Sequence, residues 1–370
     1  MRGKKIIIFI FLIIFCDNVY SQSKNVFFED INFEFNYHNG FLYAHHPSIA
    51  YLTQSYINGF DIKIGKSTNG DHLWEQLYRY PEIGIGFYNS NLGNSEVLGN
   101  VNAIYSYINL PIIKNNKIRF DYNFAFGISY LQKCFNTSDN YNNLAIGSKV
   151  NVYLNFGFDF KLKLLKQLYL ITGLEYTHFS NGAVKKPNLG LNLITCQTGL
   201  QYFLNDNDKE LIHNKIPNFE KRNEYSVILS GGIKQIAPPG GKTYPVSSAS
   251  FNAYRYLNLK HKIGLGIDIF YDSSIDMFLK MNNNGTLNDI ENKKNDLYST
   301  GIHLSHDLVF NKLSLTTQLG YYLYSTIDRD FYSRLGFKYK FSEHFFANLT
   351  LKTHWGRADF IEFGLGYFFN

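Results

Sequence analysis

The sequence predicts an all-β fold, an antiparallel β-barrel of a bacterial outer membrane. Three observations favour this class: an export leader at the N-terminus, a composition rich in aromatic residues and glycine, and several stretches of about ten residues in which apolar and polar positions alternate. Alternation with period two places the apolar side chains on one face of a strand. Such strands suit a wall with lipid on one side and a polar lumen on the other.

The first 21 residues have the pattern of a secretory signal peptide. Arg2, Lys4 and Lys5 form a basic start, residues 6–15 are an unbroken apolar run, and Val19-Tyr20-Ser21 fits a cleavage site. We therefore expect residues 1–21 to direct export and to be removed from the mature protein.

The composition excludes several other classes. Beyond the leader no apolar stretch approaches the ~20 residues that a spanning helix needs. The 29 Tyr and 33 Phe suit strands with aromatic girdles at two membrane interfaces. A net charge of +6 without a clustered basic stripe gives no indication of nucleic-acid binding. Cys134 and Cys196 could pair after export, but two cysteines are too few for a disulfide framework.

The alternation is clearest in four stretches of the chain. Each has an apolar set at every second position and a polar or glycine set between: residues 117–128, 151–162, 262–271 and 361–369. A soluble β-sandwich shows the same alternation over shorter strands and is the competing fold. The length of these stretches favours strands that cross a membrane.

The chain also repeats itself. Residues 153–161 resemble 332–340, and residues 199–205 closely match the terminal 364–370. With about eight candidate strands on each side of a charged stretch without alternation, a duplication is the simplest interpretation.

We predict the following organisation: a signal peptide over 1–21, a barrel half carrying the active site over 22–205, a linker over 206–223, and a degenerate repeat over 224–370. Closure could give one large barrel of about 14–16 strands or two eight-stranded barrels, and the frequency of single barrels among natural membrane proteins favours the first.

One segment carries candidate chemistry. His178 and Ser180 stand two residues apart at the end of an alternating strand over 168–180, so they share its apolar face. Asn192 has the corresponding parity on the next strand. Polar residues on a lipid-facing surface are costly unless they act on lipid, although polar residues are also ordinary at strand ends near headgroups.

This pattern suggests an ester hydrolase. A serine beside a histidine can attack an acyl ester, with His178 as general base for Ser180. Asn181 and the backbone amides around Gly182 are candidates to stabilise the oxyanion. Lys185 and Lys186 in the following loop could approach phosphate groups, or could simply be solvated. A strand that is seventh from a periplasmic N-terminus ends at the outer leaflet, where lipopolysaccharide lies.

The segment 178–182, followed by 187–190, resembles the active-site segment of the outer-membrane lipid A 3-O-deacylase family, the PagL-type acyloxyacyl hydrolases. The segments 65–68, 77–81 and 91–94 resemble the longer members from Bacteroidetes-type bacteria, and the resemblance covers about residues 37–205. It implies removal of an ester-linked acyl chain of lipid A by His178 and Ser180, without a cofactor and with outer-membrane lipid as the partner.

The third residue of the site departs from the family. Where its characterised enzymes have a glutamate this chain has Asn192, whose oxygen can hold the tautomer of His178 but supplies no charge. Glu175 lies three residues from His178 and hence on the other face. Activity on lipid A is therefore the leading hypothesis. A structural or porin-like barrel and a phospholipid esterase are the alternatives.

Two other features are weaker. In the second half Thr353 and Trp355 occupy the positions that match His178 and Ser180, so residues 224–370 are interpreted as a structural repeat without the reaction. His45 and His46 would face opposite ways on a strand, and no third ligand accompanies them, so we expect them to be loop residues and not a metal site.

Overall fold

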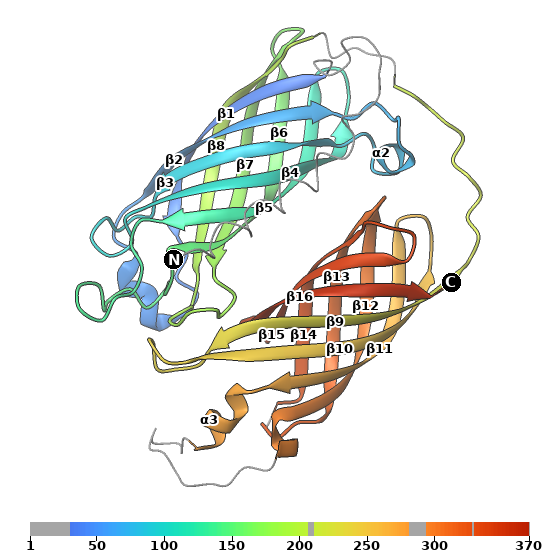
Figure 1. The fold of residues 1–370 in the computed structure, drawn as a ribbon. Helices are drawn as coiled ribbons and strands as arrows, with labels where there is room; N and C mark the ends of the chain where they lie inside the picture. The colour runs from blue at the N-terminus through green and yellow to red at the C-terminus, as the bar shows by residue number, and fades with distance from the viewer. Residues whose placement is uncertain (1–29, 206–210, 281–293, 328, 370) are drawn as a thin grey trace, which may run out of the picture.

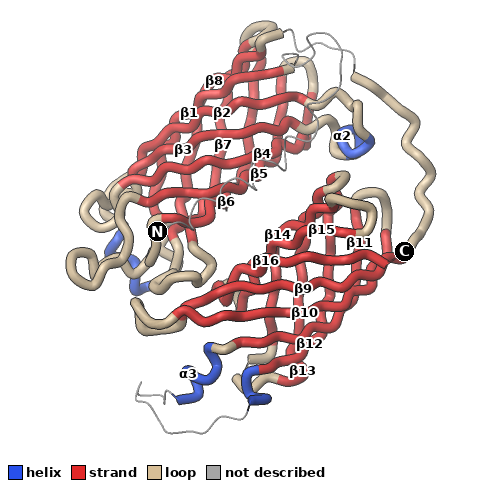
Figure 2. Tube along the Cα trace, in the orientation of Figure 1, coloured by secondary structure: helices blue, strands red, loops and turns tan. Residues whose placement is uncertain are grey.

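The computed structural model describes residues 30–205, 211–280, 294–327 and 329–369. The expected signal peptide over 1–21 and part of the expected linker lie outside these ranges. No helix in the described part of the chain is both long and apolar enough to cross a membrane. The regular structure is almost entirely β-strand (Figure 2), as the alternation predicted.

The first eight strands close into a barrel of their own (Figure 1). Each strand pairs antiparallel with the next, and β1 pairs with β8 over Asn32–Phe203 to Leu42–Leu193. The strands are β1 (Ile31–Leu42), β2 (Ile57–Ser67), β3 (Glu82–Asn91), β4 (Asn100–Lys114), β5 (Ile118–Leu131), β6 (Val150–Lys163), β7 (Leu168–Ser180) and β8 (Leu191–Phe203). A 3₁₀ helix η2 (Pro47–Leu52) and a short helix α2 (Leu73–Leu77) lie in the connections.

The remaining strands close into a second barrel, in which β16 pairs with β9. They are β9 (Asn223–Gln235), β10 (Thr243–Tyr256), β11 (His261–Asp272), β12 (Tyr298–Phe310), β13 (Leu313–Tyr324), β14 (Phe331–Lys340), β15 (Phe345–His354) and β16 (Arg357–Phe369). Helices α3 (Ser274–Lys280) and η3 (Lys294–Leu297) lie between β11 and β12.

Two closed barrels are the alternative that the sequence left open, and they replace the favoured single barrel of about 14–16 strands. The physical reason is that β8 pairs along its length with β1, which leaves no free edge to which β9 could add. The barrel class itself is confirmed. Cys134 and Cys196 are both free.

The strands present their two faces as the alternation predicted. On β1, Phe33, Phe35 and Tyr37 are exposed on the outer wall, whereas Glu34 and His38 are buried in the lumen. The apolar outer surface of the isolated chain is the surface that lipid would cover.

Paired charges fill both lumens. In the first barrel the Lys161 ammonium lies 3.4 Å from Glu34, 3.7 Å from Glu82 and 3.9 Å from Asp121. In the second barrel the Arg334 guanidinium donates to Glu362 at 2.7 Å and to Asp268 at 3.0 Å. An eight-stranded barrel is just wide enough for its side chains to fill the interior. The described lumens are therefore packed cores.

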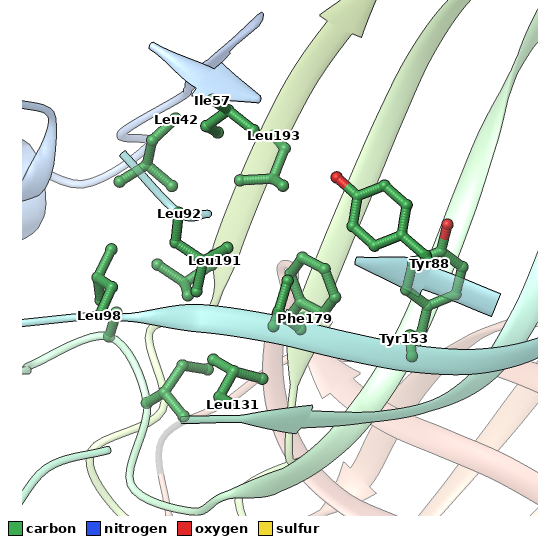
Figure 3. Packing of buried hydrophobic residues seen from close by; sticks show 14 of the residues in the cluster. Leu42, Ile57, Tyr88, Leu92, Leu98, Leu131, Tyr153, Phe179, Leu191 and Leu193 are labelled. Atoms are coloured by element: carbon green, nitrogen blue, oxygen red, sulfur yellow. The ribbon is translucent and has the colours of Figure 1, made fainter. Parts of the chain in front are cut away.

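Apolar side chains close the end of the first barrel where β7 ends and β8 begins (Figure 3). Leu42, Ile57, Phe179, Leu191 and Leu193 come from strand ends and converge there. Two residues of η2, Ile49 and Leu52, join the same cluster. The loops at this end are thus held by a hydrophobic core of their own.

The two barrels lie side by side with corresponding ends level. Next to the end of β7, the Gln235 backbone N–H donates to the Ala183 carbonyl at 2.9 Å. At the opposite end, the Tyr78 hydroxyl donates to the Val309 carbonyl at 3.0 Å, and its ring stacks on Phe310. The first contact joins loops that follow odd-numbered strands, and the second joins turns that follow even-numbered strands. Both barrels can therefore cross one membrane in the same orientation.

Lys161 tests how far the lumen charges hold the first barrel together. Replacing Lys161 with Met leaves three carboxylates without their shared cation, so we expect the free energy of unfolding to fall by about 3–5 kcal/mol. Urea unfolding in lipid vesicles measures the change. Lys117→Met removes an exposed turn lysine and is the control, and equal stability of the two variants would contradict the prediction.

Candidate active site

The last residues of β7 alternate strictly between the outer wall and the barrel interior. Phe179 is fully buried in the apolar end cluster and packs on the Tyr153 ring at 5.7 Å. Its neighbours His178 and Ser180 therefore project from the outer wall. Ser180, the last residue of the strand, is only 7% exposed. The sequence predicted that His178 and Ser180 share the outer face of the strand, and the backbone of β7 places them there.

The strand opposite supplies Asn192. Asn192 lies directly across from His178 in the β7–β8 register, and its neighbours Leu191 and Leu193 are buried in the end cluster. The distance from His178 Nδ1 to Asn192 Oδ1 is 2.6 Å. Because an amide oxygen only accepts, Nδ1 carries the proton in this bond and Nε2 of the neutral ring is free to act as a base.

His45 extends this chain of hydrogen bonds. The Asn192 Nδ2 amide lies 2.7 Å from His45 Nδ1 and donates to it. This second bond fixes the amide of Asn192 with its oxygen toward His178. His46, by contrast, accepts from the backbone N–H of Ser48 and caps η2.

Sequence reasoning placed His45 in a loop but missed this contact. His45 lies 147 positions from Asn192, and the two meet because β1 closes the barrel against β8. The same closure lets the Tyr43 N–H donate to the Asn192 carbonyl at 2.8 Å. The signal that could have found it was a polar residue just past the end of the first strand, the strand that closes against β8 when the first eight strands form a barrel of their own.

Ser180 Oγ has no hydrogen bond to His178 or to any other described residue. Catalytic hydrogen bonds are often long or absent without substrate and tighten when it binds. The structure brings Ser180, His178 and Asn192 together on one face, with Ser180 the residue nearest the loop.

Asn181 uses its side chain and its backbone N–H for hydrogen bonds that hold the loop. Its side-chain amide donates to Ser148 Oγ and to the Lys185 carbonyl, both at 2.9 Å. Its backbone N–H donates to Asn188 Oδ1 at 2.9 Å. Of the two predicted oxyanion groups, only the backbone amide of Gly182 has no acceptor among the described residues.

Two glycines allow close approaches around the site. Gly190 has φ +81°, and a Cβ there would lie 2.8 Å from Cε1 of His178. Gly182 has φ +61°, and a Cβ there would lie 2.3 Å from the side chain of Ile361 on β16. The first glycine leaves room for the imidazole, and the second seats the loop against the second barrel.

The two loop lysines differ. Lys185 is exposed, whereas Lys186 is half-buried and faces the second barrel, where its backbone N–H donates to Gln235 Oε1 at 3.0 Å. Burial lowers the pKa of the Lys186 ammonium; nearby Lys234 and Arg357 lower it further, and Asp359 opposes them.

Residues outside the site behave as separate structural groups. Glu175 lies in the lumen, 3.6 Å from His38, and cannot reach His178 from there. In the second barrel Thr353 bonds to Ser333 at 2.7 Å, and His354 to the Tyr322 hydroxyl at 2.9 Å. No group of three or more metal-binding side chains occurs within the described ranges.

Each of the two barrels matches a protein-family model. The family described as lipid A 3-O-deacylase (PagL) matches residues 59–201, and the acyloxyacyl hydrolase C-terminal domain matches residues 223–370. The chain belongs to the lipid A 3-O-deacylase family. These matches confirm the family that the sequence resembled and place the chain among lipid A deacylases.

Other comparisons add little to this assignment. No curated protein matches the chain. The crystal structure of Neisserial surface protein A is 8% identical, with 48% of this chain and 98% of that chain covered and a TM-score of 0.35. A mutant of the monoaromatic hydrocarbon channel TodX is 10% identical, with 92% and 91% covered and a TM-score of 0.18.

Gly190 tests the space around the imidazole. We expect Gly190→Ala to lower lipid A deacylation at least tenfold, because the new methyl displaces the His178 ring and a 1 Å shift in a reacting group costs about a hundredfold. Gly240→Ala is the matched control, since Gly240 has the same φ of +81° and nothing within 4 Å of the new Cβ. The measurement is the rate of acyl release by purified variants, with circular dichroism as a check on folding. Equal losses in both variants would assign the effect to backbone strain.

Proposed function

We propose that this protein is a serine esterase that removes the 3-O-linked acyl chain of lipid A at the outer leaflet of the outer membrane. The observation that supports this most is the chain His45–Asn192–His178, which orients an imidazole next to Ser180 on the outer wall. Family membership supplies the substrate class.

In the proposed mechanism Ser180 Oγ attacks the ester carbonyl and its proton passes to His178 Nε2. The tetrahedral intermediate collapses, the bond to the sugar oxygen breaks, and that oxygen takes the proton from Nε2. Water then attacks the acyl-enzyme with His178 again as base, which releases the fatty acid and restores Ser180. The Gly182 backbone N–H is the candidate donor to the oxyanion.

Asn192 has a more limited role here than a carboxylate would have. It accepts the Nδ1 hydrogen of His178 and so keeps Nε2 unprotonated in the resting enzyme. It adds no negative charge to stabilise the imidazolium. The donated hydrogen bond to His45 stops the amide from rotating, so in this proposal His45 is a positioning residue for Asn192.

The location of the site favours a substrate that remains in the membrane. Leu170 and Leu174 precede His178 on the same outer face of β7 and are exposed to the surrounding medium. Acyl chains of a bound lipid can lie along this apolar surface while the ester meets Ser180 at the strand end. The filled lumens make conduction through either barrel a weaker alternative.

Ser180→Ala is the direct test of the proposal. Mass spectrometry of lipid A should show loss of one acyl chain in cells that express the native protein and none with Ser180→Ala, because the nucleophile is gone. Thr172→Ala is the control, since Thr172 lies on the outer face of the same strand far from His178. Identical spectra for native and variant would favour a structural barrel. Release of fatty acid from phospholipid only would favour a phospholipid esterase.

The hydrogen-bond chain predicts coupling between His45 and Asn192. We expect Asn192→Ala to lower kcat roughly tenfold or more and His45→Phe about fivefold, with little change in KM, because each loosens the tautomer and orientation of His178. Both variants act through one imidazole, so the double variant should be no slower than Asn192→Ala alone. Kinetics on purified lipid A measures all three. If the losses in kcat were fully additive, His45 would not act through Asn192.

A further inference from the structure

A cavity of about 700 Å³ opens between the barrels beside the β7–β8 loop. Its wall contains Ala183 and Lys186 from the first barrel, and Lys234, Arg329 and Arg357 from the second. Its volume is in the range of small-molecule sites, about 300–1,000 Å³. Figure 1 shows the loop after β7 next to the β9–β10 hairpin at this end of the molecule.

The cavity has more positive than negative charge. Of its two carboxylates, Asp359 is already paired with Lys234 and with Lys352, each at 2.7 Å. Asp330, the other, is exposed. The Lys186 ammonium and the Arg357 guanidinium form no salt bridge with any described residue. The wall thus contains cations that no described carboxylate pairs in a salt bridge.

The cavity is tied directly to the proposed nucleophile. Ala183 lies three residues after Ser180, and its carbonyl accepts the hydrogen bond from Gln235 of β9. Gly182 packs on Ile361 of β16. The loop that follows the proposed nucleophile therefore forms one wall of the cavity, and the second barrel forms the rest.

Aromatic side chains border the cations. The Trp355 and Phe331 rings contact each other edge to face at 5.6 Å and both line the cavity. Apolar ring faces beside cations suit a ligand that combines a sugar with an anionic group. An isolated phosphate would use only the cations.

We propose that this cavity binds a phosphate monoester on the sugar head group of lipid A while Ser180 acts on the ester. The second barrel is then part of the substrate site, although it has no counterpart of His178 and Ser180. The inference rests on the proposed function for its substrate, and a binding measurement separates the two.

Trp355 supplies that measurement. The chain has two tryptophans, so Trp74→Phe leaves Trp355 as the sole indole, and Ser180→Ala prevents turnover. We expect phosphorylated lipid A to change the fluorescence of this double variant in a saturable way. Dephosphorylated lipid A should need at least tenfold more ligand for half the change, because the charge-assisted hydrogen bonds are lost. Inorganic phosphate should compete at higher concentration, and phosphatidylglycerol vesicles, which carry only a phosphodiester, should not.

Steady-state kinetics of variants that keep Ser180 gives a second readout. Lys186→Met and Arg357→Met should each raise KM for phosphorylated lipid A about tenfold, with kcat nearly unchanged and no effect on dephosphorylated lipid A. Lys242→Met removes an exposed lysine of the β9–β10 loop that does not line the cavity, and it should leave KM unchanged.

Each outcome decides the inference. Equal affinity for phosphorylated and dephosphorylated lipid A, or an equal response to phosphatidylglycerol, overturns it. A KM that rises on every substrate also overturns it, because the residues would then be structural. A saturable Trp355 response without turnover by the native enzyme would retain the phosphate site and reject the esterase.

Discussion

The burial of Phe179, Leu191 and Leu193 in the end cluster of the first barrel is the constraint on which the proposed chemistry depends. A strand has only two faces, so fixing these three side chains inward fixes His178, Ser180 and Asn192 outward. A slip of one residue in either strand would move the polar residues into the apolar core. The cluster therefore sets the geometry of the site as well as the stability of the loops around it, and no element outside the barrel is needed to aim the nucleophile.

Placing the site on the outer wall explains why a neutral amide can serve next to the histidine. Asn192 is only 4% exposed, and a carboxylate in that place would have to lose most of its hydration. The amide avoids this cost. If it rotated, however, its nitrogen would replace its oxygen opposite His178, whereas the two oxygens of a carboxylate are equivalent. His45 supplies the missing restraint, since its Nδ1 accepts only from the amide nitrogen. With asparagine in place of a carboxylate, the site loses the negative charge that would stabilise the imidazolium.

Local pattern in the sequence predicted what depends on local structure, and long-range pairing escaped it. Period-two alternation gave the strands, their faces and the shared face of His178, Ser180 and Asn192. It could not decide between one barrel and two, because each strand looks the same whichever partner closes the sheet. His45 was missed for the same reason, as its contact with Asn192 exists only through the pairing of β1 with β8. Asn181 was predicted as an oxyanion donor from its position, but its hydrogens are used to build the loop.

Two small barrels offer something that a single large one would not. A wide barrel encloses its polar space as a lumen, which a lipid in the bilayer cannot enter from the side. Two filled barrels instead leave a groove outside both lumens, the cavity between the β7–β8 loop and the second barrel. The contact of Gly182 with Ile361 and the hydrogen bonds of Gln235 place the reactive loop at the edge of this groove. A second barrel without a counterpart of Ser180 can therefore still shape the proposed site, because a lipid substrate would approach from outside both barrels.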